Sequence, residues 1–112
     1  MSLTLIMALA MGMAQGDPVD SARKGFNACL TKFTNESLAA KKSPSVFTKE
    51  AADACATEKK ALVDAMIASE MQYGGKKAEA ESYASEESQM MVDSYVGSYG
   101  EFLTSGSRHG KT

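Results

Sequence analysis

The side chains best suited to covalent or catalytic chemistry in this sequence are two cysteines, Cys29 and Cys55, and a single histidine, His109. The cysteines lie far apart and have no histidine beside them, so they form neither a CxxC redox motif nor a zinc-binding motif. In a small exported chain, two cysteines favour a disulfide. In a cytosolic chain they would be two buried thiols that behave as small hydrophobic side chains. We therefore expect a Cys29–Cys55 disulfide if the protein is exported.

His109 lies in a Gly- and Ser-containing stretch at the end of the chain, where nothing would fix its orientation. A Ser-His-Asp or Cys-His arrangement needs a histidine held within hydrogen-bond reach of the nucleophile. The paired acids Glu86 and Glu87 fall in a polar helical stretch that is typical of a solvated face. We therefore predict a non-enzymatic protein with no catalytic residue and no bound cofactor.

Metal ligands are also sparse in the sequence. Clustered methionines can hold Cu(I), but Met66, Met71, Met90 and Met91 recur at helical spacing and are expected to fill gaps in the core. Glu58 falls near the centre of an otherwise apolar helical stripe, where it either pairs with a lysine across the fold or reaches water. No metal site is predicted.

The first 16 residues form a separate compositional class because they contain no charged side chain. Residues 3–13 are apolar, and Gly12-Met13-Ala14 offers a small-x-small cleavage site, as in a secretory signal peptide that lacks its basic region. The apolar run is shorter than the roughly 20 residues that span a bilayer. We predict a signal peptide over residues 1–14 and a periplasmic or secreted protein. The alternative is a cytoplasmic protein whose N-terminal segment is a helix of the fold.

The charges of the chain argue against two classes of partner. There are 14 acidic and 12 basic side chains, which give a net charge of −2, and both signs are interspersed. Binding to nucleic acid needs a clustered positive face, and attachment to an anionic membrane surface needs a polybasic patch. Neither pattern occurs, so we predict a protein partner or self-association instead.

Hydrophobic periodicity predicts three helices. The first begins at Asp17-Pro18, where an Asp cap precedes a proline at the first helical position, and it ends before Pro44. The second begins near Ser45 or Thr48 and runs to about residue 73, before Gly74-Gly75. The third runs from about residue 76 to 98, within a single helical domain over residues 17–103. A flexible tail is expected over residues 104–112.

Residue counts predict how these helices pair. If the first two form a hairpin bent at residues 41–45, Cys29 and Cys55 lie within about one helical turn of the same level. Pairing the second and third helices about the two glycines places Met90 level with Lys59 and Phe102 level with Phe47. The predicted fold is all-α: a three-helix up-down-up bundle, built from a disulfide-stapled hairpin and a third helix, or a dimer that completes the bundle.

The same pairing leaves Val63, Ile67 and Met71 facing small or polar residues, where they form either an interaction patch or, if the helices cross at other angles, part of the core. We therefore predict a small exported helical binding protein without catalytic activity. The alternative is a carrier of a small apolar ligand between the helices. Four side chains would line its cavity: Met66, Met90, Tyr95 and Phe102.

Overall fold

The computed structural model describes residues 17–106, and these residues form helices without any strand. The helices are α2 (Pro18–Ala39), α3 (Pro44–Ala54), α4 (Ala56–Gln72) and α5 (Lys77–Ser105). The all-α prediction is confirmed. The predicted signal peptide and residues 107–112 lie outside the described residues, whereas Thr104 and Ser105, assigned to the flexible tail from the sequence, belong to α5.

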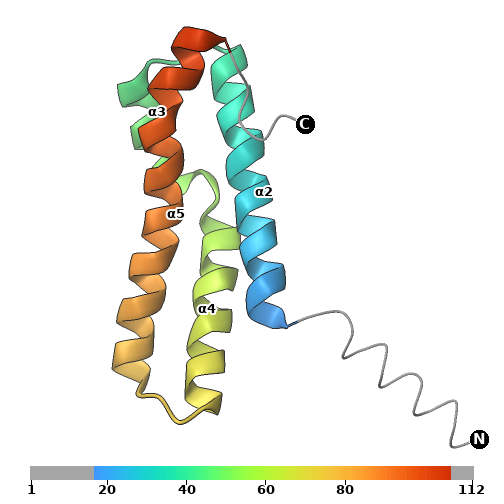
Figure 1. Ribbon diagram of the computed structural model, residues 1–112, viewed down its shortest axis with the longest axis vertical. Helices are drawn as coiled ribbons and strands as arrows, with labels where there is room; N and C mark the ends of the chain where they lie inside the picture. The colour runs from blue at the N-terminus through green and yellow to red at the C-terminus, as the bar shows by residue number, and fades with distance from the viewer. Residues whose placement is uncertain (1–16, 107–112) are drawn as a thin grey trace, which may run out of the picture.

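The helices lie alongside one another in an elongated arrangement. Figure 1 shows α3 and α4 end to end, with α2 and α5 running beside them. Both α3 and α4 contact α2 as well as α5. The N-terminal end of α2 stops short of the α4–α5 turn, so the last turns of α4 and the first turns of α5 extend beyond it (Figure 1). None of the described helices is long and apolar enough to cross a membrane.

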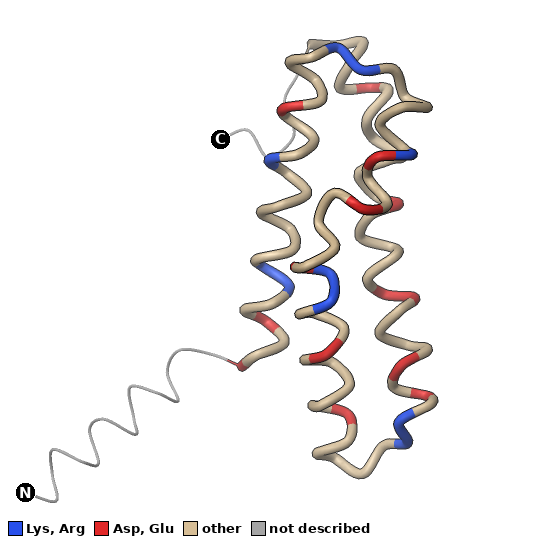
Figure 2. The backbone as a smooth tube through the Cα atoms, turned by 180° about the vertical axis from the view of Figure 1, so that it is seen from behind, with Lys and Arg blue, Asp and Glu red and all other residues tan. Residues whose placement is uncertain are grey.

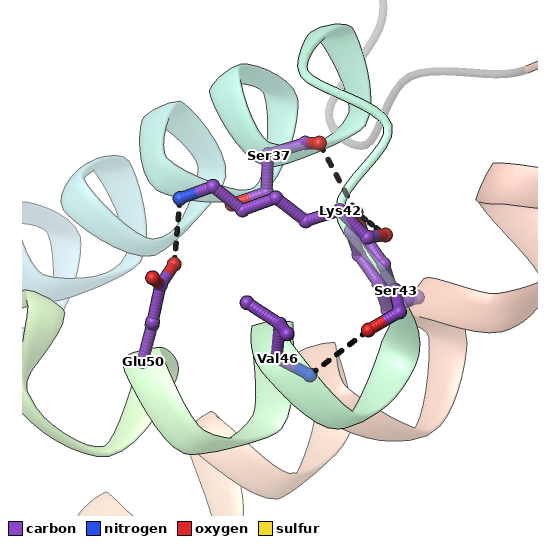
Figure 3. Close-up of polar contacts among 6 residues, drawn as sticks. Ser37, Lys42, Ser43, Val46 and Glu50 are labelled. Atoms are coloured by element: carbon purple, nitrogen blue, oxygen red, sulfur yellow. Dashed lines mark hydrogen bonds and ion pairs between the residues drawn. The ribbon is translucent and has the colours of Figure 1, made fainter.

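Helix α2 begins and ends where local chemistry dictates. The Asp17 carboxylate accepts a hydrogen bond of 2.7 Å from the backbone N–H of Asp20, and Pro18 occupies the first helical position. At the other end Lys41 adopts a left-handed backbone conformation with φ of 57°. The Ser43 hydroxyl then accepts a hydrogen bond from the backbone N–H of Val46 and caps α3 (Figure 3). The predicted bend at residues 41–45 is therefore present.

The prediction of one continuous second helix is wrong. Two helices, α3 and α4, meet at Cys55, whose φ of −122° and ψ of 42° lie outside the helical range. Neither glycine nor proline occurs at this junction, so the sequence carries no local breaking signal. The break coincides with the residue that is covalently fixed to α2.

Aromatic rings join three of the helices at the end of the molecule that contains α3. The Phe47 ring of α3 stacks on Tyr99 of α5 with centroids 4.0 Å apart, and on Phe33 of α2 at 5.2 Å. Phe47 and Tyr99 are fully buried. This pairing agrees within one helical turn with the level predicted for Phe102. A second contact supports the predicted level of Lys59, since its ammonium group donates to Gln89 over 3.0 Å.

The Tyr99 hydroxyl also ties α5 to the end of α2. It lies 3.1 Å from the carbonyl oxygen of Ser37 and 2.7 Å from that of Lys42, and its proton is shared between these two acceptors. Carbonyl groups at a helix C-terminus lack intrahelical partners, so this tyrosine supplies a hydrogen-bond donor at the end of α2. Beside it, the Lys42 side chain pairs with Glu50 of α3 at 2.6 Å (Figure 3).

Candidate functional site

The two cysteines form the expected disulfide. Cys29 of α2 bonds to Cys55 at the α3–α4 junction, and their Cα atoms are 6.0 Å apart. The half-buried carboxylate of Glu58, in the first turn of α4, lies within 4.8 Å of both sulfur atoms. In residues 17–106 this is the one group of three or more such donor side chains close enough to share a metal ion. Both sulfurs are committed to each other in the oxidised chain, so the bond acts as a cross-link between α2 and the junction.

The predicted interaction patch is largely covered. Val63 and Ile67 are half-buried and pack against the core, whereas Met71 is 48% exposed. Helix α5 contacts α4, and the polar first half of α5 contributes small buried side chains. Ala80, Ala84 and Ser88 recur every four residues, and all three are buried. Small residues allow two helices to approach closely, so a helix face lined by small side chains can still pack against apolar ones.

The four residues expected to line a ligand cavity do not converge. Met66 and Tyr95 are buried in the core, Met90 is 67% exposed, and Phe102 is half-buried near the end of α5. The Tyr95 hydroxyl lies 2.9 Å from that of Thr31 on α2, so it serves helix packing.

A concave surface lies where α2 begins, against the last turns of α4 and the first turns of α5. Two neighbouring hollows of about 440 and 180 Å³ share Val19, Arg23 and Ser69. We call them together the α2–α4–α5 groove. Tyr73 borders the larger hollow and Tyr83 the smaller one, and these rings are 82% and 58% exposed. Two aromatic side chains therefore flank one continuous depression.

An ion pair crosses the groove. The Arg23 guanidinium of α2 contacts the Glu87 carboxylate of α5, and both side chains are partly exposed. Hydrogen bonding from Arg23 holds the pKa of Glu87 below its usual value, and a weaker contribution comes from Tyr83. The hydrogen bond between the Tyr83 hydroxyl and the Glu87 carboxylate also raises the pKa of Tyr83. Arg23, Glu87 and Tyr83 thus form a small network in which the cation is already engaged.

The groove carries negative charge. Arg23 is the cation among its lining residues, which also include four acids: Asp17, Asp20, Glu70 and Glu87. In Figure 2 the charged residues along the second half of α4 and the first half of α5 are mainly acidic. A negative field with exposed aromatic rings suits a cationic ligand better than an anionic one.

A second hollow of about 660 Å³ lies at the opposite end of the molecule, between the C-terminal ends of α2 and α5. Lys41 is its charged lining residue, and Leu38, Phe102 and Leu103 form its apolar wall. These three side chains are half-buried. The wall therefore offers less exposed apolar surface than the two tyrosines of the α2–α4–α5 groove.

Sequence reasoning missed most of this groove. Arg23 and Glu87 are 64 residues apart, and no local pattern in the sequence pairs them. Comparison of the chain with protein-family models, curated proteins and solved structures gives no match. The functional argument therefore depends on the geometry and charge of the groove.

Proposed function

We propose that this protein is a small non-catalytic interaction module that acts outside the cytoplasm and docks a protein partner through the α2–α4–α5 groove. The observation that carries the proposal is a pair of exposed tyrosines, Tyr73 and Tyr83, which border two adjoining hollows lined by four acids. Exposed aromatic side chains are enriched at protein interfaces, where they anchor the partner.

The chemistry of the groove favours a basic, partly apolar segment as the partner. Lysine or arginine side chains can lie over the tyrosine rings and pair with Asp17, Asp20 or Glu70. Val19 and the small α4 residues Ala65 and Ala68 provide an apolar floor for one face of such a segment. Two copies of this chain would bring like charges together if they met groove to groove. A different protein is therefore favoured over a symmetric dimer through this surface.

Export and bundle architecture belong to the same proposal. Residues 1–14 would be removed as a signal peptide, and the Cys29–Cys55 disulfide supports an oxidising compartment because such bonds persist there. In the mature protein, α3 and α4 would act as one bent arm of a three-helix up-down-up bundle. The bend would leave the last turns of α4 and the first turns of α5 free to form the groove with the start of α2.

A binding experiment tests the proposal directly. The probe is a fluorescein-labelled amphipathic helical peptide of leucine and lysine, followed by fluorescence anisotropy. We expect the double variant Y73A/Y83A to weaken binding at least about tenfold, equivalent to about 1.4 kcal/mol. Added salt should weaken it further, because the acidic rim contributes.

Two controls make the result specific. Met90→Ala removes a side chain that is 67% exposed but lies outside the groove, and it should leave affinity unchanged. A peptide with glutamate in place of lysine should not bind. Equal loss in M90A and Y73A/Y83A, or equal binding of both peptides, would refute docking through this groove.

A further inference from the structure

Glu58 occupies an unusual position for a carboxylate. It is half-buried beside the Cys29–Cys55 disulfide, within 4.8 Å of both sulfurs. Among the described residues, neither an ion pair nor a hydrogen bond engages its side chain. Its carboxylate oxygens are therefore not engaged by another side chain of the described residues, and they lie beside the sulfur atoms.

We propose that reduction of this disulfide creates a zinc site with Cys29, Cys55 and Glu58 as its three protein ligands. A dithiol reductant supplies two electrons and two protons and itself becomes a disulfide, while the S–S bond gives two thiols. Zn²⁺ then displaces the two thiol protons to solvent and forms two Zn–S bonds and one Zn–O bond. Water completes the fourth position, as in zinc sites with three protein ligands. The proposal is independent of docking at the groove.

The geometry suits a tetrahedral ion. Zn–S bonds of about 2.3 Å and Zn–O bonds of about 2.0–2.2 Å place neighbouring ligand atoms roughly 3.5–4 Å apart. The three donor atoms already lie within 4.8 Å of one another, so rotation of side chains suffices once the S–S bond is broken. The Cα atoms of the cysteines, 6.0 Å apart, can stay in place.

The helix break contributes to the same site. Cys55 is the N-cap of α4 and Glu58 lies in the first turn of that helix. The positive end of the helix dipole favours a thiolate over a thiol there, and it favours a carboxylate as well. Two thiolates with one carboxylate form a donor set that zinc accepts. The metal would then hold α2 against the junction in place of the covalent bond.

Titration of the full chain, reduced with a phosphine, with Co²⁺ as a spectroscopic substitute tests the proposal. We expect a sulfur-to-cobalt charge-transfer band that saturates at one ion per chain and is displaced by Zn²⁺. The oxidised protein should give no such band. Glu58→Gln should weaken binding at least about tenfold, whereas Glu86→Gln, a matched change on α5, should leave it unchanged.

Circular dichroism under the same conditions separates a folded site from binding by an unfolded chain. We expect reduced, zinc-loaded protein to keep its helical signal and to lose thermal stability when a chelator is added. The absence of a charge-transfer band in the reduced protein would overturn the proposal. So would equal affinity of the wild type and E58Q, or binding without helical structure.

Discussion

Removal of the disulfide should have a large and calculable effect on stability. The variant C29A/C55A removes the bond without adding a polar group, which matters because Cys55 is 3% exposed. The cross-link closes a separation of 26 residues. The chain-entropy relation gives about 12 cal/mol/K for a loop of this size, or about 3.5 kcal/mol at 25 °C. That is a large fraction of the roughly 5–15 kcal/mol that stabilises a typical domain.

Urea denaturation followed by far-UV circular dichroism measures this effect. With a slope of about 1–1.5 kcal/mol/M, expected for a small domain, the midpoint should fall by about 2.3–3.5 M. Reduced wild-type protein should show a similar fall, provided that a chelator is present to keep metal from bridging the thiols. Adding the reductant to C29A/C55A is the control and should change nothing.

A loss below about 1 kcal/mol in C29A/C55A would refute this reasoning. It would mean that the unfolded chain already holds α2 near the α3–α4 junction, so that closing the loop removes little entropy. A lowered midpoint with an unchanged or raised slope would instead support it, because release of the cross-link acts on the unfolded chain and can only increase the surface that this chain exposes.

Three further perturbations test the packing and the groove. Tyr99→Phe leaves two backbone carbonyls without their hydroxyl donor and should lower the unfolding free energy by about 1–2 kcal/mol in urea titrations; Tyr83→Phe, an exposed control, should leave the midpoint unchanged. Phe47→Ala empties a fully buried site between two rings and should cost about 3–5 kcal/mol, whereas Phe47→Leu should cost clearly less; equal costs would contradict the stacking geometry. Arg23→Gln should cost at most about 1 kcal/mol at neutral pH, because the ion pair is partly exposed. Arg23 lowers the pKa of Glu87 in the folded state, so the stabilisation from this ion pair is present above the unfolded pKa of Glu87 and is lost as pH falls through the folded pKa. The unfolding free energies of wild type and R23Q should therefore converge in acid. A difference between them that grows below about pH 4 would be inconsistent with this pair.

The parts of the fold that depend on local pattern could be predicted from the sequence. The apolar spacing from Val19 to Phe33 and the Asp17-Pro18 start defined α2, and both are present in the structure. Counting residues from the bend placed Cys29 opposite Cys55 because the rise per residue of a helix is constant. These inferences hold because helix geometry converts sequence distance directly into spatial distance.

The remaining features depend on contacts that no local pattern specifies. The break at Cys55 lacks a glycine or proline, and it occurs where a long-range bond fixes the backbone. Val63 and Ile67 pack against the core, although the predicted helix pairing leaves them facing small or polar residues. The Arg23–Glu87 pair joins α2 to α5 across 64 residues.

Two interactions hold α2 in place beside the groove: the Cys29–Cys55 disulfide and the Arg23–Glu87 ion pair. Cys29 and Arg23 are six residues apart on α2, or about 9 Å along its axis. At Cys29 the helix is held covalently, and at Arg23 it is held by a partly exposed ion pair that contributes little free energy. The start of α2 is therefore held less firmly than the part of the helix around Cys29. Loss of the disulfide should therefore act mainly on folding stability, while loss of Arg23 should act mainly on the shape and charge of the groove.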